Sequence, residues 1–169
     1  MRDLAVLLNE MRAAGVIVEY ALFGAAAQMR YTEAVATLDA DVLISVLQPE
    51  RLDILTPVYE FCAQRGYMPV GEAVQIGPWP VQFVPVFNQL TREAVDQAET
   101  ADFEGIPFRV VRAAHLAGIA MSTGRAKGFA RILALSESGS VAPAEIQGLA
   151  QRHGLLESWN RFKARFLDE

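Results

Sequence analysis

The sequence predicts an α+β protein in which helices flank a mixed β-sheet and the C-terminal portion is helical. Two nearly continuous apolar runs, at 16–23 and 39–47, are typical of strands that are buried inside a sheet. Two hairpin patterns follow, at 72–86 and 101–111, each with a glycine between its strands. From Arg112 onward the apolar residues recur at helical spacing, so we expect helices to the end of the chain.

The N-terminal half should alternate helices with strands. Apolar residues recur at helical spacing in 3–14 and a glycine follows, which predicts an amphipathic helix. A short helix is expected over 25–29, after the first buried strand. The stretch 49–65 is predicted to be helical, with an interruption at Pro57 where a second helix starts. Its apolar stripe consists of Leu52, Leu55, Tyr59 and Cys62.

The second half should contain five helices. One is expected over 91–98, between the two hairpins, and two more over 113–122 and from Arg125 onward. A fourth should run from Pro143 to Gly154. The last helix carries an apolar stripe of Leu156, Trp159, Phe162 and Phe166, which we interpret as packing within the molecule, the alternative being a partner-binding face.

Length and composition indicate one domain. The chain has 169 residues, of which 52% are hydrophobic and 21% charged, as in an ordinary globular protein. We therefore expect a single domain over 1–169, with an α/β core in 1–111 and the helical portion, 112–169, packed on it. No apolar run reaches membrane-spanning length, so no membrane association is expected.

The cysteine count indicates the cellular compartment, and the net charge limits the classes of binding partner. A single cysteine excludes an internal disulfide and suits a reducing compartment, so we expect a cytoplasmic protein. The formal net charge of −5 argues against a broad nucleic-acid footprint but leaves room for a small local basic site. Cys62, His115 and His153 are interpreted as structural, because each belongs to a helix face or a helix end.

Asp39 and Asp41 open the second buried strand and should project from the same face, as alternate residues of a strand do. Two adjacent carboxylates repel each other unless a cation lies between them. Mg²⁺ suits this position, since it takes oxygen ligands and bridges carboxylates to phosphates. Upstream, Gly24 lies between a strand and a helix, where backbone N–H groups can bind phosphate. Taken alone, the aspartate pair and the strand–glycine–helix junction are each also common in proteins without such a site.

Together the two features resemble the signature of the nucleotidyltransferase superfamily. In that signature a hydrophobic residue and a glycine precede an Asp-x-Asp pair flanked by hydrophobic residues. Phe23 and Gly24 open it here, and Asp39 and Asp41 close it, whereas Ala25 stands where the superfamily has glycine or serine. The resemblance implies that the chain binds a nucleoside triphosphate (NTP) with Mg²⁺. Asp39 and Asp41 would be catalytic metal ligands, and Gly24 and Ala25 would contact the phosphates.

The superfamily also has a third acidic residue, on a neighbouring strand, which binds metal and acts as a base. The residue expected at that position here is Gln82, whose amide oxygen can bind a metal but cannot accept a proton. Glu72 is the better acidic substitute, because Glu104 should be exposed beside a turn. A two-metal site is compatible with the resemblance, and we expect good NTP binding with slow or absent turnover.

A basic segment forms the second candidate site. Lys127 and Arg131 are one helical turn apart, and like charges at this spacing mildly destabilise a helix. A bound triphosphate would offset this repulsion, and the alternative is a solvated basic face.

Residues 107–131 resemble the corresponding part of small bacterial nucleotidyltransferase-fold proteins, including toxins of abortive-infection systems. Those proteins carry a Gly-Arg-x-Lys-Asp element. Gly124, Arg125 and Lys127 match it, whereas Gly128 replaces the aspartate. The resemblance implies that Arg125 and Lys127 contact the phosphate tail.

Two functions follow from these residues. The first is an NTP- and Mg²⁺-binding protein that transfers a nucleotidyl group to an unknown hydroxyl acceptor, such as a protein, an RNA end or a small molecule. The second is a catalytically silent nucleotide-binding or interaction module, for example a toxin–antitoxin component. A protein partner or a homo-oligomer is compatible with either function.

Overall fold

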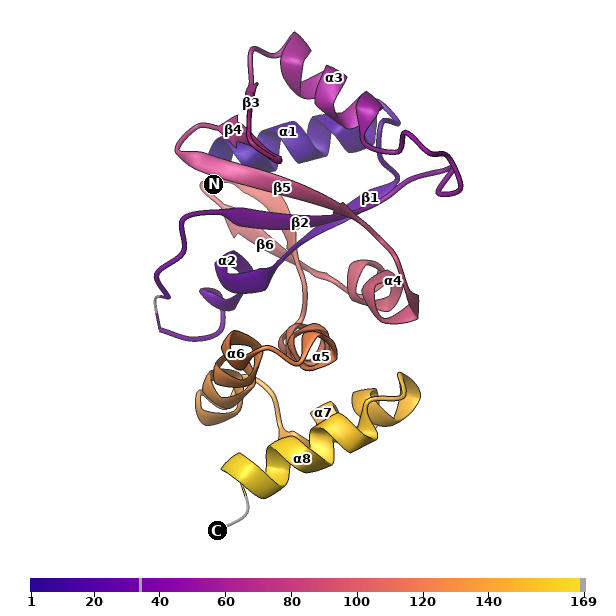
Figure 1. The fold of residues 1–169 in the computed structure, drawn as a ribbon. Helices are drawn as coiled ribbons and strands as arrows, with labels where there is room; N and C mark the ends of the chain where they lie inside the picture. Colours follow the sequence, from indigo (N-terminus) through magenta and orange to yellow (C-terminus); the bar gives the residue numbers. More distant parts are fainter. Residues whose placement is uncertain (34, 168–169) are drawn as a thin grey trace.

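The structure, a computed structural model, describes residues 1–33 and 35–167. Strands and helices are interspersed as far as β7, and the elements after β7 are helical, which confirms the predicted α+β class (Figure 1). In chain order the elements are α1 (Arg2–Ala13), β1 (Glu19–Phe23), α2 (Gly24–Gln28), β2 (Ala40–Ser45), α3 (Thr56–Gln64), β3 (Met68–Val70), β4 (Ala73–Ile76), β5 (Trp79–Pro85), α4 (Gln89–Asp96), β6 (Glu99–Phe103), β7 (Ile106–Val110), α5 (Ala113–Thr123), α6 (Ala126–Glu137), α7 (Pro143–Arg152) and α8 (Leu156–Phe166).

The seven strands form one mixed sheet in the order β3-β4-β5-β2-β1-β7-β6. The central strand β1 is antiparallel to β2 and parallel to β7, and β2 is parallel to β5. The pairs β3–β4, β4–β5 and β6–β7 are antiparallel hairpins. The two apolar runs of the sequence therefore lie side by side in the middle of the sheet.

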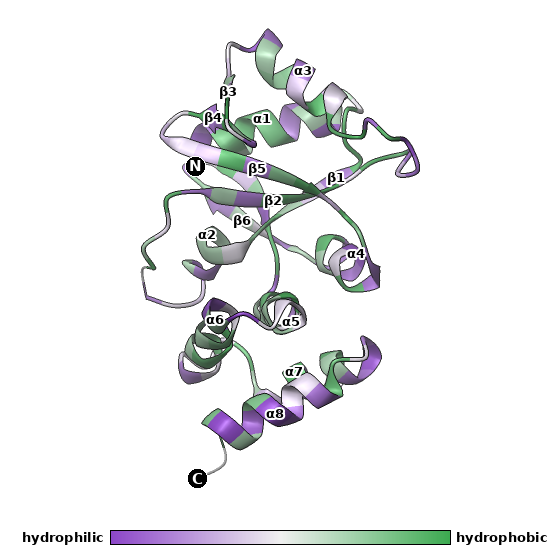
Figure 2. Cartoon of the chain, viewed as in Figure 1, coloured by the Kyte–Doolittle hydropathy of each residue, from purple (hydrophilic) through white to green (hydrophobic). Residues whose placement is uncertain are grey.

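Helices cover both faces of this sheet (Figure 1). α1 and α3 lie on one face, whereas α2, α4 and α5 lie on the other, and α6, α7 and α8 continue beyond α5. Figure 2 shows that apolar residues concentrate on the central strands, while α8 presents many polar residues to solvent. In the described part of the chain, no helix has both the length and the apolar character needed to span a membrane.

The prediction for 49–65 is wrong in its first half. The helix begins at Thr56, and the preceding residues form turns in which Leu52 is fully exposed. Pro57 explains the boundary, because its ring clashes with the carbonyl four residues earlier and its nitrogen has no proton to donate. The predicted stripe is replaced by a shorter buried set, Val58, Phe61 and Cys62.

Two details of the hairpin region differ from the prediction. The strand β3 was not expected, and it is a short, exposed edge strand whose proline is tolerated there because one side of the strand needs no partner. Trp79, expected in a turn, lies in β5 opposite Ile76 and is half-buried. The turn itself consists of Gly77 and Pro78, and Gly77 has a φ of +58°.

The helical portion depends on a close approach between α5 and α6. A Cβ atom added at Gly128 would lie 2.6 Å from the carbonyl oxygen of Ala120, so any side chain there would push the two helices apart. The glycine that departs from the Gly-Arg-x-Lys-Asp element thus has a packing role. On α8, Trp159 and Phe162 of the predicted stripe are buried within the molecule, whereas Leu156 and Phe166 at its two ends are partly exposed.

Candidate functional site

The junction between β1 and α2 brings Gly24 into contact with the side chain of Asp41. Gly24 has a φ of +68°, and a Cβ atom added to it would lie 2.7 Å from Oδ2 of Asp41. Glycine is required here twice, once for the left-handed backbone and once for the space. The motif glycine and the second motif aspartate therefore form one structural unit.

Two neighbouring strands, β2 and β5, place polar residues side by side at this end of the sheet, and β1 flanks them. Asp41 is paired with Phe23 on β1 and with Gln82 on β5. Gln82 is exposed between two buried neighbours, Val81 and Phe83, as expected of a strand with one polar face. The structure thus confirms that the expected strand lies next to Asp41 and that Gln82 is the residue beside it.

Asp39 lies just before β2 and is exposed. Its position is fixed by Thr37, whose Oγ1 donates to the Asp39 carbonyl oxygen at 3.0 Å and lies 3.2 Å from its Oδ1. Burial raises the pKa of Asp41 above its ordinary value, and the negative charge of Asp39 raises it further. The two carboxylates therefore behave as a like-charged pair, which a bound cation would stabilise.

Arg131 of α6 is the basic residue that the fold brings toward this pair. Its positive charge lowers the pKa of Asp41, against the two effects that raise it, and burial lowers the pKa of Arg131 itself. Arg131 Nε donates to Oε1 of the buried Gln28 at 3.0 Å, so α2 orients the guanidinium. The sequence signal for this residue was its spacing from Lys127, but nothing in the sequence joined it to Asp41.

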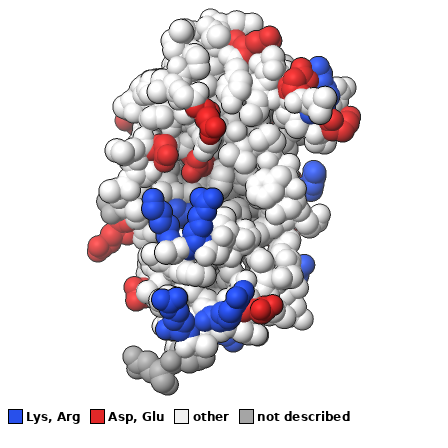
Figure 3. Space-filling model, in the orientation of Figure 1, with Lys and Arg blue, Asp and Glu red and all other residues white. Residues whose placement is uncertain are grey.

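The two predicted phosphate-binding residues lie further along the same helix. Arg125 directly precedes α6 and Lys127 is in its first turn, about 6 Å or more from Arg131 along the axis, and both are exposed. Figure 3 shows acidic side chains beside β2 and, next to them on the same face, a group of basic side chains between α2 and α6. The face around the aspartates is therefore electrostatically suited to a metal-bound polyphosphate.

The acidic substitutes for Gln82 lie elsewhere. Glu72 belongs to the two-residue turn between β3 and β4, and Glu104 is an exposed turn residue with a φ of +51°. Within residues 1–33 and 35–167, no group of three or more His, Cys, Asp or Glu side chains is placed to hold a metal ion. The donor set that fits Mg²⁺ is thus two carboxylates and one amide oxygen, leaving further positions for water and phosphate.

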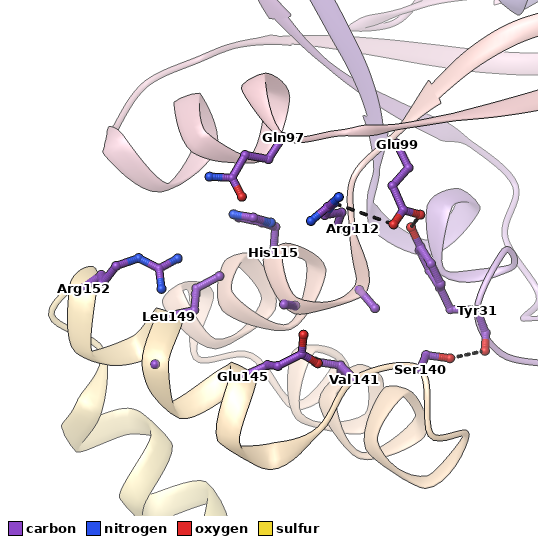
Figure 4. A pocket seen from close by; sticks show the side chains of 13 residues that line it. Tyr31, Gln97, Glu99, Arg112, His115, Ser140, Val141, Glu145, Leu149 and Arg152 are labelled. Carbon is purple, nitrogen blue, oxygen red and sulfur yellow. Dashed lines mark hydrogen bonds and ion pairs between the residues drawn. The ribbon is translucent and has the colours of Figure 1, made fainter.

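A separate cavity of about 350 Å³ lies between α4, β6, the start of α5 and α7 (Figure 4). None of the predicted site residues lines it. Three of its polar side chains are paired with one another: Arg112 Nε lies 3.6 Å from Glu99 Oε1, and Tyr31 donates to Glu99 Oε2 at 3.4 Å. We therefore assign this cavity no part of the Asp39–Asp41 site.

Both histidines contact the same carboxylate next to this cavity. Nε2 of His115 lies 3.0 Å from Glu93 Oε1, Nε2 of His153 lies 2.9 Å from Oε2, and Arg152 donates to Oε1 at 2.6 Å. His115 Nδ1 is buried without a hydrogen-bond partner, and burial lowers the pKa of His115. These contacts agree with the structural interpretation of both histidines. Cys62 is likewise buried, and burial raises the pKa of its thiol to about 11, which disfavours a nucleophilic role.

Comparison with solved structures shows which fold this is. No protein-family model matches the chain, and a search of curated proteins found no match. The crystal structure of an antigenic nucleotidyltransferase-like protein from Paracoccidioides brasiliensis aligns with a TM-score of 0.59 at 16% identity, covering 97% of this chain and 94% of that one. The solution structure of the antibiotic-resistance factor ANT(2'')-Ia aligns with a TM-score of 0.50 at 12% identity, covering 94% of this chain and 97% of that one.

These similarities extend over almost the whole chain, including the C-terminal helices. The protein therefore has the nucleotidyltransferase fold, as the motif resemblance predicted. At these low identities the comparison shows the fold alone, so the ligands and the reaction have to be argued from the site.

Proposed function

We propose that this chain binds an NTP together with Mg²⁺ at the Asp39–Asp41 end of the sheet and transfers its nucleotidyl group slowly to a hydroxyl acceptor. One observation carries the proposal. The carboxylate of Asp41 is held against Gly24, at the N-terminal end of α2, with Asp39 and Gln82 beside it. Carboxylates and a phosphate can share a Mg²⁺ ion, and glycine lets the backbone approach that phosphate closely.

Each residue has a distinct role in this proposal. Asp39 and Asp41 hold the metal, and the backbone at Gly24 and Ala25 contacts the phosphates. Arg125 and Lys127 reach the distal phosphates from the start of α6. Arg131, oriented by Gln28, adds a fixed charge close to Asp41. Its guanidinium stays protonated at neutral pH, so it is suited to hold a phosphate oxygen beside the metal.

The reaction that fits this arrangement is a displacement at the α-phosphorus. The acceptor hydroxyl oxygen forms a bond to that phosphorus, and the bond to the bridging oxygen breaks. Pyrophosphate leaves with the bonding electrons. When bound, Mg²⁺ supplies charge stabilisation at the phosphates. The hydroxyl proton passes to water, because the amide of Gln82 cannot accept it. A positioned base typically contributes about 10²–10⁴-fold, which is why we expect slow turnover.

The alternative is a catalytically silent member of the fold that binds nucleotide or a partner, for example as a toxin–antitoxin component. The observation that favours it is the absence of a third carboxylate beside Asp41 among the described residues. This alternative shares the nucleotide site with the main proposal and differs in the transfer step.

Thermal unfolding with each of the four NTPs, with and without Mg²⁺, tests the binding site. A ligand that binds only the folded state raises its stability, by about 2.7 kcal/mol at a hundredfold excess over Kd. Asp41→Asn should remove the metal-dependent part of this rise while leaving the fold intact. Equal stabilisation of the parent and the variant by Mg²⁺–NTP would place the site elsewhere. Labelled NTP then distinguishes transfer from silent binding.

A further inference from the structure

A second cavity lies on the same face as the proposed site, where α8 meets the α5–α6 corner. We call it the α8 cavity. Its volume is about 440 Å³. It is lined by Met121, Gly124, Phe129, Ser158, Arg161, Phe162, Arg165 and Phe166. None of the roles proposed above uses it.

The floor of the α8 cavity is aromatic. The ring of Phe166 lies 5.0 Å from that of Phe162 and 6.3 Å from that of Phe129, measured between centroids. Phe162 is buried, whereas Phe166 remains 39% exposed. An exposed aromatic ring on a buried aromatic support is a surface on which a planar base can stack.

The rim of the α8 cavity is basic. Arg161 and Arg165 are four residues apart on α8 and both line the cavity, so they form a like-charged pair on one helix face. The side chain of Arg161 is 73% exposed, and its contact with Glu157 is long, at 4.0 Å. The guanidinium of Arg165 lies 5.1 Å from the centre of the Phe166 ring. Among residues 1–33 and 35–167, neither guanidinium has an ion-pair contact shorter than 4.0 Å.

α6 connects this cavity to the proposed active site. Gly124 lines the α8 cavity, Arg125 directly precedes α6 and Lys127 is in its first turn. Further along the helix, the charge of Arg131 acts on Asp41. The helix covers only about 8 Å between its first residue and Arg131. Figure 3 shows a second basic group on this face, over α8, below the one beside the aspartates. Basic residues therefore lie both at the cavity and at the start of α6 toward the aspartates, although the whole chain carries a net charge of −5.

We propose that the α8 cavity binds a base near the end of a single-stranded nucleic acid, whose phosphates follow the basic residues of α6 toward Asp41. This inference rests on the proposed function, because it identifies the hydroxyl acceptor as the terminal hydroxyl of that strand. Stacking on Phe166 combined with phosphate contacts from arginines is the usual means of binding single strands without sequence preference. A strand end suits the limited size of the basic area better than a duplex would.

Fluorescence anisotropy with a labelled single-stranded oligoadenylate, as RNA and as DNA, tests binding. EDTA should be present and NTP absent, so that the result does not depend on the proposed metal site. The double variant Arg161→Ala with Arg165→Ala should reduce the slope of log K against log salt by about 1.4, since each phosphate contact contributes about 0.7. Phe166→Ala should weaken binding about tenfold through lost stacking.

The matched control is the double variant Arg92→Ala with Lys163→Ala. It removes the same charge from α4 and α8 without touching the lining of the α8 cavity. The control should bind the oligonucleotide as the parent does, and both double variants should bind Mg²⁺–NTP normally.

Each other outcome overturns the inference. The first such outcome is that the parent does not bind the oligonucleotide at low salt. The second is an equal loss of oligonucleotide affinity in both double variants. The third is preferential binding of poly-glutamate, which would indicate an acidic peptide as the ligand. A parent that binds Mg²⁺–NTP but no oligonucleotide disproves this inference alone. Oligonucleotide binding without any NTP binding disproves the proposed nucleotide site and leaves the nucleic-acid surface standing.

Discussion

Gly24 and Asp41 occupy adjoining space, so that a single methyl group on the glycine would lie 2.7 Å from the aspartate Oδ2. This contact joins the start of the helix at which we place the phosphates to the carboxylate at which we place the metal. The two residues are far apart in the sequence but meet because β1 and β2 pair with Phe23 opposite Asp41. A substitution at one of them should therefore displace the other.

Gly24→Ala should destabilise the protein and displace Asp41. The left-handed backbone alone costs about 1–2 kcal/mol for a residue with a Cβ atom, and the clash adds to it. Gly139→Ala is the matched control, because Gly139 has a φ of +72° and open space around it. Urea unfolding of both variants measures the difference. Equal losses of unfolding free energy would show that Asp41 yields without cost.

Gln82→Asp should increase the rate of nucleotidyl transfer, or the rate of a slow background consumption of NTP, at least tenfold. The reason is that a positioned base contributes about 10²–10⁴-fold. The substitution should also lower Tm by a few degrees, because a third carboxylate joins a pair in which the pKa of Asp41 is already raised. The control is Gln75→Asp, which adds the same charge on β4, away from β2. High activity in the parent that Gln82→Asp leaves unchanged would mean that another group supplies the base.

Lys127→Ala and Arg131→Ala should have different effects on nucleotide binding. Lys127 is exposed at the start of α6, so its loss should weaken triphosphate binding about tenfold and monophosphate binding less. Arg131 is half-buried beside Asp41, so its loss should weaken both. Calorimetry with NTP and NMP, with Lys163→Ala as the control, separates the two effects. Equal weakening of both ligands by Lys127→Ala would remove this residue from the distal phosphates.

The arrangement of Asp41 and Gln82 was predictable because strand periodicity is local. Apolar runs indicate buried strands. The second and fifth strands are neighbours, as the motif resemblance implied, and the structure adds that they are parallel. The close contact at Gly24 follows from a different pairing, that of β1 with β2, which sets Phe23 opposite Asp41. The metal, nucleotide and phosphate roles of these residues, and the division at residue 111, stay predictions.

The features that were not predicted depend on long-range contacts or on weak local signals. Arg131 approaches Asp41 from α6, which packs closely against α5 at Gly128, and no pattern within one segment encodes that approach. The strand β3 is three exposed residues with a central proline, which resembles a loop in every local respect. The turns before Thr56 were mistaken for helix because apolar spacing outweighed the effect of Pro57.

Acid should destabilise this protein in two steps, the first at His115 and the second at its partner Glu93. Burial lowers the pKa of His115 from 6.5. Just below pH 6.5, His115 is therefore protonated in the unfolded chain but stays neutral in the folded chain. Burial alone would raise the pKa of Glu93, but hydrogen bonds from Arg152, His115 and His153 lower it to about 2, from 4.5. Stability is thus lost first as pH falls below 6.5 and again between pH 4.5 and about 2.

Urea unfolding at a series of pH values separates the two steps. Each group should contribute a slope of up to about 1.4 kcal/mol per pH unit within its window. His115→Gln keeps an N–H donor for Glu93 but cannot titrate, so it should flatten the curve just below pH 6.5 and leave the steeper acid limb in place. Glu93→Gln should reduce stability at neutral pH and remove its share of the acid limb, because it replaces the carboxylate that three donors share. A parent curve that is flat from pH 7 to pH 5, with His115→Gln superimposed on it, would show that His115 is not held neutral by the fold.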